Sequence, residues 1–347
     1  MILAFDTSNY TTSLALVSRE GKIIKDERIP LKVKKGERGL RQSDALFQHW
    51  GNLPELAERA LSDVPAEQIQ AVAASDRPRA VEGSYMPVFL AGIQFGRALA
   101  ATLHVPFFTF SHQEGHMAAG SFETALEGQD TFLAWHLSGG TCELLRWSKG
   151  QEELLGGTLD LSFGQVIDRI GVAMGLGFPA GKALDEMALR AAEKREEEGR
   201  ILAAQRKKLP KLNQFSRVTI KGLRFNLSGL ETQLQRALDA LGKDLKTLEN
   251  EQNPDAEAAA SQRRDLLVLE LFTKMADCLW AVSSAAAEET GLPKVLFAGG
   301  VSSSAFLRRE LVKRAEGSGI TLAFGRPALS SDNAVGTALL GRDAVWP

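Results

Sequence analysis

The chain has 347 residues, of which 44% are hydrophobic and 24% are charged, and its formal net charge is −2. This composition is typical of a folded globular protein and excludes an intrinsically disordered chain. The near-neutral charge means that any contact with nucleic acid must come from a local basic patch. Two cysteines, neither in a CxxC pair, indicate a reducing compartment. Because the sequence has no basic-then-apolar leader and no long apolar run, we expect a cytoplasmic protein without a membrane span.

Two segments about 130 residues apart share one layout of strand, polar loop, strand and charged turn. The first has predicted strand segments at 2–5 and 14–17, and the second has them at 132–137 and 142–146. A duplicated hairpin of this kind is typical of a two-lobed fold that clamps a nucleotide. Two unrelated hairpins are the simpler alternative.

The rest of the chain alternates predicted helices with buried strands, as expected for an α/β protein. In chain order we predict a helix over 88–102, a strand over 105–110, charged helices over 182–210 and a helix from 228 followed by a polar loop over 250–262. After this loop we predict a long helix over 266–288, a strand over 295–298, a helix over 303–315 and a last helix starting near Asp332.

His112 and His116 are spaced so that both imidazoles project from one face of a helix and can share a metal ion. Ser111 is suited to cap that helix. Two histidines on a polar helix face are the alternative interpretation. The motif is HQEGH rather than HExxH, so Glu114 points away from the shared face, and a zincin-type protease is not supported.

Three polar or glycine-containing strand ends are candidates for binding phosphate, namely 6–8, 138–141 and 299–302. Asp332 opens the last predicted helix, where it can act as an N-cap, as a third metal ligand or as both. Asp168 is an acid within an apolar helix and needs a partner, for which a ribose hydroxyl is a candidate.

In this order, the motifs resemble the TsaD/Gcp family of tRNA threonylcarbamoyladenosine transferases, formerly described as O-sialoglycoprotein endopeptidases. The resemblance covers essentially the whole chain. Its motifs are DTS (6–8), HQEGH (112–116), LSGGT (137–141), FGQVIDRIGVAMGLGFPAGKALDEMA (163–188), GLRFNLSGLET (222–232), FAGGVSSSAFLR (297–308) and SDNAVG (331–336).

The resemblance implies an actin/hexokinase-like (ASKHA) duplicated two-lobe α/β fold with nucleotide and metal in the cleft between the lobes. We expect an N-terminal lobe of residues 1–115, completed by 325–347, and a C-terminal lobe of 116–324 with a charged helical insertion near 182–262. The resemblance implies one divalent metal ion, iron or zinc, held by His112, His116 and Asp332. For the adenine nucleotide substrate it implies His136, Leu137, Ser138, Gly139, Gly140, Asp168, Gly181, Gly300 and Ser304.

The implied reaction is metal-assisted transfer of the threonylcarbamoyl group from threonylcarbamoyl-AMP to the adenosine 3′ of the tRNA anticodon, without a side-chain nucleophile. The implied partners are tRNA and TsaB-like and TsaE-like proteins. Two basic stretches are candidates for holding the tRNA, and two solvated loops of ordinary lysine content are the alternative. The first stretch comprises Lys32, Lys34, Lys35, Arg38 and Arg41, and the second Arg206, Lys207, Lys208, Lys211, Arg217, Lys221 and Arg224.

Several positions depart from the family pattern. Thr141 stands where the family has a histidine, Ser304 where it has an asparagine, and Gln165 where it has a glutamate, while 75–84 replaces a T-x-G-P-G-L segment. The metal ligands are retained but the nucleoside site is altered. The alternative function is therefore that of a divergent paralogue, which binds nucleotide and metal but carbamoylates another acceptor or regulates a partner.

Overall fold

The computed structural model describes residues 1–8, 10–33, 40–148, 151–249 and 255–347, apart from the side chains of 243–249 and 255–257. The chain forms two compact units. The first contains Met1–Asp130, Trp147–Glu152 and Ala323–Pro347, and the second contains Thr131–Arg146 and Glu153–Leu322. The first unit is therefore built from both ends of the chain.

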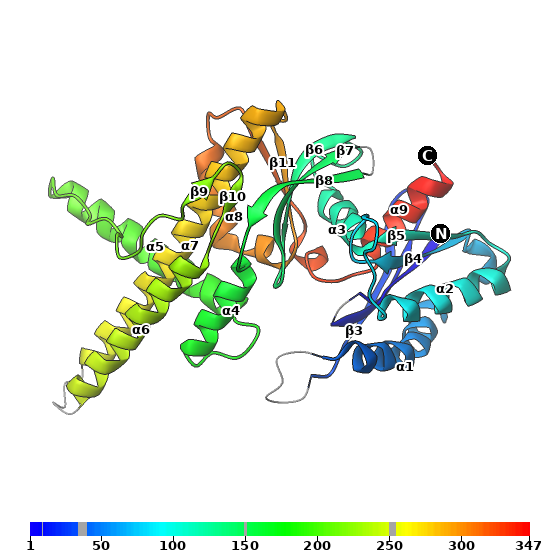
Figure 1. The fold of residues 1–347 in the computed structure, drawn as a ribbon, viewed down its shortest axis with the longest axis horizontal. Helices are drawn as coiled ribbons and strands as arrows, with labels where there is room; N and C mark the ends of the chain where they lie inside the picture. The colour runs from blue at the N-terminus through cyan, green and yellow to red at the C-terminus, as the bar shows by residue number, and fades with distance from the viewer. Residues whose placement is uncertain (9, 34–39, 149–150, 250–254) are drawn as a thin grey trace. The chain divides into compact units, whose positions relative to one another are not determined.

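A five-stranded sheet of order β3-β2-β1-β4-β5 forms the centre of the first unit (Figure 1). Its strands are β1 (Ile2–Asp6), β2 (Thr11–Val17), β3 (Ile23–Pro30), β4 (Ala71–Arg77) and β5 (Phe107–Ser111). β1 pairs antiparallel with β2 and parallel with β4, and β4 pairs parallel with β5. The carboxyl ends of β1, β4 and β5 consequently meet at one edge of the sheet.

Alternating side chains of the sheet bury two separate cores, as the period of two in a strand requires. Leu3 and Phe5 of β1 face α1 (Gln42–Leu61) and α2 (Phe89–Leu103). Ile2 and Ala4 face the opposite way, toward α3 (His112–Ser121) and α9 (Val335–Val345). The sheet therefore lies between two helical layers. Helices α1 and α2 cover one face, and α3 and α9 cover the other.

The second unit repeats this strand order. Its seven-stranded sheet has the order β12-β11-β6-β7-β8-β10-β9, with β6 (Thr131–Leu137), β7 (Cys142–Ser148), β8 (Gln151–Thr158), β9 (Ile220–Lys221), β10 (Arg224–Phe225), β11 (Lys294–Ala298) and β12 (Thr321–Phe324). β6 occupies the position of β1, between a hairpin partner and the parallel strand β11. The duplication predicted from the two hairpins is confirmed.

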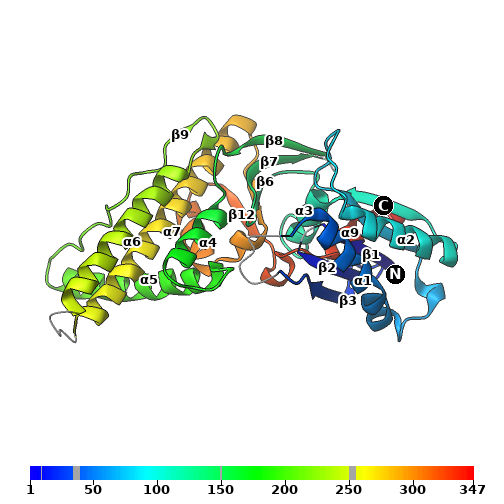
Figure 2. The same ribbon diagram turned by 60° about the horizontal axis from the view of Figure 1, so that its bottom comes forward.

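Helices of the second unit pack around a long central helix (Figure 2). The central helix is α7 (Asp255–Thr290), which contacts α5 (Gly181–Ala204), α6 (Ser228–Glu249) and α8 (Ala305–Ala315). Helix α4 (Phe163–Ala173) packs against α5 and α6. Residues 250–254 of the loop predicted over 250–262 lie outside the described residues, and the prediction was wrong from 255 onward, because those residues begin α7. Within the described residues, no helix combines the length and apolar character needed to cross a bilayer.

Asp160 ties the end of β8 to the start of α6. Its carboxylate accepts hydrogen bonds from the backbone N–H groups of Leu161 at 2.6 Å, Leu227 at 2.8 Å and Ser228 at 3.1 Å. Burial raises the pKa of Asp160, but the bonds from Ser228, Leu227 and Leu161 outweigh it and hold this pKa well below its ordinary value. The carboxylate therefore caps α6, and it stabilises the fold most strongly while it is ionised.

Replacing Asp160 by Ala should lower the free energy of unfolding by about 1–2 kcal/mol at neutral pH, because three donors lose their acceptor. A group with a depressed folded pKa contributes stability above its unfolded pKa of about 4, and the contribution disappears as the pH falls through the folded value. Urea unfolding at neutral and acidic pH measures this, with Asp239→Ala on the exposed face of α6 as control. Equal losses in both variants would contradict the cap.

Candidate metal centre and anion-binding turns

The two histidines are placed by the junction between β5 and α3. Strand β5 ends at Ser111 and α3 begins at His112, so the helix starts at the carboxyl edge of the sheet. Ser111 accepts a hydrogen bond from the Glu114 N–H, and the Glu114 carboxylate accepts one from the Ser111 N–H, forming a capping box. The cap predicted at Ser111 is confirmed. Glu114 is engaged in capping, which explains why this acid stands at the third motif position.

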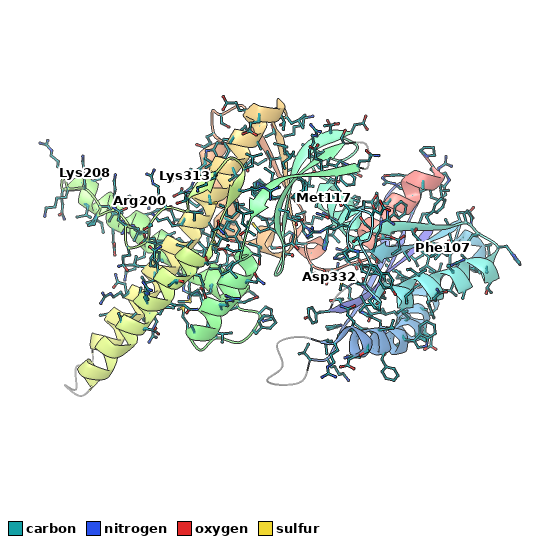
Figure 3. The ribbon with its side chains drawn as sticks, viewed as in Figure 1. Phe107, Met117, Arg200, Lys208, Lys313 and Asp332 are labelled. Atoms are coloured by element: carbon teal, nitrogen blue, oxygen red, sulfur yellow. The ribbon has the colours of Figure 1, made fainter. Side chains whose placement is uncertain are left out.

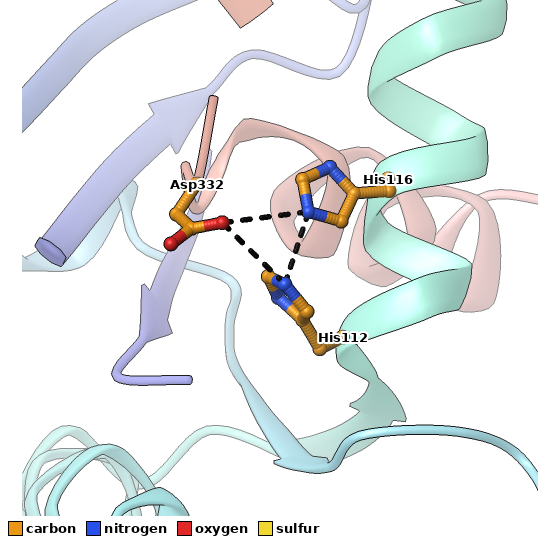
Figure 4. A group of neighbouring side chains, drawn as sticks. All are labelled: His112, His116 and Asp332. Atoms are coloured by element: carbon orange, nitrogen blue, oxygen red, sulfur yellow. Dashed lines mark hydrogen bonds and ion pairs between the residues drawn. The ribbon is translucent and has the colours of Figure 1, made fainter. Parts of the chain in front are cut away.

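His112, His116 and Asp332 point toward one another in the first unit (Figure 4). Their candidate ligand atoms all lie within 4.8 Å of one another. The two imidazole Nε2 atoms are 3.0 Å apart, and each is 3.6 Å from Oδ1 of Asp332. All three side chains are largely shielded from solvent. The structure thus brings the predicted trio together in an arrangement that can hold a metal ion.

A second carboxylate, that of Asp6, orients His112. Its Oδ2 lies 2.7 Å from His112 Nδ1, and its Oδ1 accepts a 2.7 Å hydrogen bond from the Ser8 N–H. Asp6 is 1% exposed. With Nδ1 bonded to this carboxylate, Nε2 is the ring nitrogen that faces the trio, and carboxylate–histidine pairs of this type fix the orientation of metal ligands. The segment 6–8 stays a candidate phosphate-binding loop, and its Asp6 also contacts a candidate metal ligand.

Asp332 lies in a loop before α9. The helix begins at Val335 with Ala334 as its N-cap, so the prediction that Asp332 opens the helix was wrong. Asn333 fixes the loop: its amide donates to the carbonyls of Leu329 and Ser331 at 2.9 and 2.8 Å, and its oxygen accepts from the Val335 N–H at 3.0 Å. The Asp332 carboxylate is therefore not used as a helix cap.

Arg28 of β3 ties the same loop to the sheet. Its guanidinium donates to Ser331 Oγ and to the Ala328 carbonyl, both at 2.9 Å. Asp26 holds the guanidinium by two hydrogen bonds of 2.9 and 2.6 Å. Ser331 immediately precedes Asp332, so this chain of contacts restrains the position of the candidate ligand.

The helices that flank the trio touch backbone to backbone. A Cβ atom at Gly336 of α9 would overlap the Gly115 carbonyl oxygen of α3. Only glycine permits this approach. The close packing joins the α9 segment, which follows Asp332, to the helix that carries His112 and His116.

In the second unit, the candidate anion-binding turn follows β6. Ser138 closes the turn, with its N–H donating to the Thr141 carbonyl at 2.9 Å and its Oγ accepting from the Thr141 N–H at 3.0 Å. The start of α4 supports the turn, because Ser162 Oγ donates to the Gly139 carbonyl at 2.6 Å. A Cβ at Gly164 would lie 2.6 Å from the Gly139 Cα. Gly139 and Gly140 are exposed, with open space beside them.

The other predicted nucleotide-binding residues are linked through the helices of this unit. Asp168 of α4 accepts a 2.8 Å hydrogen bond from the Ala180 N–H, next to Gly181 at the start of α5. Burial raises the pKa of Asp168, and the bond from Ala180 only partly offsets this. Gly300 follows the end of β11, which pairs with β6. His136 is buried at the end of β6, and Leu137 next to it is 1% exposed.

Asp185 of α5 caps α8 and binds Ser304. Its carboxylate accepts a hydrogen bond from the Ser304 hydroxyl and two from the N–H groups of Ala305 and Phe306, at 2.9 and 3.1 Å. Ser304 Oγ also accepts from the Leu307 N–H at 3.0 Å. The serine that departs from the family pattern is therefore engaged in capping a helix.

Sequence reasoning missed Asp26, Arg28 and Asp185, and it gave Asp6 another role. These residues lie far from their partners in the sequence, and only the folded chain brings them together. A partial signal existed for Asp185, which falls four residues after Gly181 within a motif already singled out.

The repeated strand order places the chain in the actin/hexokinase-like (ASKHA) fold class. Among solved structures, HypF from T. kodakarensis superposes with a TM-score of 0.55 at 13% sequence identity, covering 99% of this chain and 48% of that one. Identity at this level supports the fold alone. The fold predicted from the sequence is confirmed.

The family follows from the sequence comparisons. Residues 25–339 match the family model TsaD, tRNA N6-adenosine threonylcarbamoyltransferase. Proteins of that name from Neorickettsia sennetsu and Pelobacter propionicus are 28% and 30% identical, covering 96% and 98% of this chain and 90% and 91% of their own lengths. The chain belongs to the TsaD family, as its motifs predicted.

The Asp6–His112 contact makes a prediction for the metal-free protein. Burial disfavours the charged imidazole, but the Asp6 carboxylate, aided by Asp332, raises the pKa of His112 to about 9. A group whose pKa is raised by folding stabilises the folded state. This contribution is fully present below the unfolded pKa of about 6.5, and it is lost as the pH rises through the folded pKa. After removal of metal by a chelator, ring-nitrogen NMR should therefore show His112 still protonated at pH 8.

Asp6→Asn removes the negative charge beside His112, so that burial becomes the dominant influence on this imidazole. The pKa of His112, measured as the midpoint of its NMR titration, should then fall below the ordinary histidine value. Asp63→Asn, which breaks an exposed ion pair with Lys25, serves as the control and should leave the midpoint unchanged. A wild-type midpoint near the unperturbed histidine value, or equal shifts in both variants, would rule out the described contact.

Proposed function

We propose that this protein transfers the threonylcarbamoyl group from threonylcarbamoyl-AMP to the N6 amine of the adenosine 3′ of the tRNA anticodon. The observation on which this proposal rests is the family match over residues 25–339. The matched region contains His112, His116 and Asp332, whose side chains lie together in the structure. Relatives that match 96% of the chain or more are named tRNA N6-adenosine threonylcarbamoyltransferase, which supports the group transferred and the N6 acceptor. The assignment thus rests on nearly the whole sequence and on a chemically suited site.

A divalent metal ion fits the trio. With ligand bonds of about 2.1 Å, two ligands on a tetrahedral ion lie about 3.4 Å apart. The observed separations of 3.0 and 3.6 Å bracket this value. Two imidazole nitrogens and one carboxylate oxygen suit iron or zinc better than magnesium. When bound, such an ion supplies Lewis-acid stabilisation of negative charge on a carbonyl or phosphate oxygen.

The chain's own residues supply orientation around that ion. Asp6 holds His112 with Nε2 facing the trio, and Arg28 restrains the loop that carries Asp332. Such preorganisation lowers the reorganisation needed when charge develops. In the reaction, N6 forms a bond to the carbamoyl carbon and loses a proton, while the bond from that carbon to the phosphate oxygen breaks and AMP leaves with the electron pair.

For the nucleotide, we infer a role for the turn after β6 and the residues linked to it. The exposed backbone of Gly139 and Gly140, beside the start of α4, is suited to phosphate oxygens. The Asp168 carboxylate is suited to accept a hydrogen bond from a ribose hydroxyl. Gly181, Gly300, Ser304 and the segment 136–138 complete the proposed adenylate site.

We expect the chain to act with TsaB-like and TsaE-like proteins on tRNA. One observation favours a different acceptor as the second candidate. Ser304 stands where the family pattern has an asparagine, and its hydroxyl is occupied by Asp185 and the Leu307 N–H. A paralogue with an altered nucleoside site would carbamoylate another amine or regulate a partner.

The metal proposal predicts that His112→Ala and Asp332→Ala reduce bound zinc or iron to background. Asp6→Asn and Arg28→Gln should each lower the affinity for the metal ion about 10-fold or more, as the loss of residues that hold metal ligands in place does. Calorimetric titration with Zn²⁺, and with Fe²⁺ under anaerobic conditions, measures these affinities. Arg59→Gln, which removes a surface ion pair with Glu55, is the control. Unchanged affinity in His112→Ala would refute the site.

The transfer itself is tested with threonylcarbamoyl-AMP, unmodified tRNA and the cognate partner proteins. Mass spectrometry of digested tRNA should detect threonylcarbamoyladenosine. Asp168→Ala should weaken adenylate binding by about 1–3 kcal/mol, the cost of losing a paired hydrogen bond to a charged group. If a typical family member modifies the tRNA under the same conditions and this chain does not, the proposed function is overturned and the paralogue alternative is left standing.

A further inference from the structure

The segment between α5 and α6 has an unusual charge pattern. Residues 205–225 contain seven cationic side chains and no aspartate or glutamate. They are Arg206, Lys207, Lys208, Lys211, Arg217, Lys221 and Arg224. Since the whole chain has a net charge of −2, a charge of +7 here leaves −9 for the rest. We call 205–225 the basic strap.

All seven cations of the basic strap are exposed. Within the described ranges, none of them takes part in an ion pair. The neighbouring helices differ: Arg200 pairs with Glu197, Arg309 approaches Glu196, and Arg314 pairs with Asp277. The positive charge of the strap is therefore not neutralised by ion pairs with other described residues, and it is available to an external anion.

The strap is fixed to the helices beneath it although most of it lies outside regular secondary structure. Glu270 of α7, 1% exposed, accepts hydrogen bonds from the N–H groups of Gln214 and Phe215 at 3.1 and 2.9 Å. Gln233 of α6 accepts one from the Ser216 N–H at 2.9 Å. Phe215 is buried. The strap thus presents its cations from an anchored backbone.

The end of the strap is held in the same way. Lys221 and Arg224 flank the turn between β9 and β10, and β10 pairs with β8 in the sheet. At the other end, the Arg195 side chain of α5 donates to the Pro210 carbonyl. The Lys208 side chain projects away from the helices of its unit (Figure 3).

We propose that the basic strap binds the phosphate backbone of the tRNA. Lys and Arg side chains neutralise phosphates and release counterions, and this contact requires no particular base sequence. The buried aromatic Phe215 gives no surface for stacking bases, so the expected contact is with the backbone rather than with bases. The inference rests on the proposed function, which makes tRNA the substrate. In the other basic stretch, Lys34, Lys35 and Arg38 lie outside the described residues.

The test uses two double charge reversals, Lys207→Glu with Lys208→Glu, and Arg217→Glu with Lys221→Glu. The matched control is Lys22→Glu with Arg97→Glu, two exposed cations of the first unit, which changes the net charge equally. Glutamine versions of each pair separate lost attraction from added repulsion. Thermal melting establishes that each variant is folded.

Affinity for an unmodified tRNA transcript is measured by fluorescence anisotropy over a series of KCl concentrations. Each strap reversal should weaken tRNA binding about 10-fold or more near 0.1 M salt. It should also reduce the magnitude of the slope of log K against log salt by about one to two, since each phosphate contact contributes about 0.7–0.9 to that slope. The control should change both quantities much less. Equal effects of strap and control reversals, or no binding by the wild type, would overturn the proposal.

A second arm uses vesicles of phosphatidylserine and phosphatidylcholine. Strap-dependent binding to these vesicles without strap-dependent binding to tRNA would assign the strap to a membrane surface and overturn the RNA proposal. The transfer assay separates this inference from the proposed function: the strap variants should raise the KM for tRNA and retain kcat at saturating tRNA. If no variant forms the modified nucleoside while the strap still governs tRNA affinity, the proposed function fails and the strap stands.

Discussion

Parallel pairing of β1, β4 and β5 determines where the chemistry of the first unit can be. It brings the carboxyl ends of three strands to one edge, so that Asp6 at the end of β1 lies beside His112, which directly follows β5. The antiparallel hairpin on the other side of β1 then supplies Arg28 of β3, which reaches the loop before Asp332. The contacts that orient His112 and restrain the loop before Asp332 therefore depend on this arrangement of strands.

The two halves of the duplication have developed different loops on the same strand order. After β1, the first half has side chains that carry charge and hydroxyl groups, which contact a candidate metal ligand. After β6, the second half has Gly139 and Gly140, which expose backbone instead. A repeated scaffold thus offers side-chain ligands in one unit and main-chain donors in the other, which are the two kinds of groups needed around a metal ion and a phosphate.

Local spacing in the sequence was sufficient for the features that depend on one helix or one hairpin. The i, i+4 spacing of His112 and His116 and the cap at Ser111 belong to this group, as do the paired hairpins. Contacts between distant residues were not predictable, because nothing in the sequence near Arg28 specifies that it reaches Ser331. The start of α7 was missed for another reason: residues 255–260 are polar but rich in alanine, and their helix propensity outweighs their lack of an apolar face.

The composition of the first unit from both ends of the chain has a consequence for synthesis on the ribosome. The sheet and α3 are translated first, but Asp332 and the helix α9 that covers one face of the sheet belong to Ala323–Pro347. Until those last residues emerge, Ile2, Ala4 and Ala73 have no helix α9 to cover them, and His112 and His116 have no third partner. The whole second unit is made in the interval. The candidate metal centre can therefore assemble only after Ala323–Pro347 has been translated, and a nascent chain stalled before this segment has two histidines without their third partner.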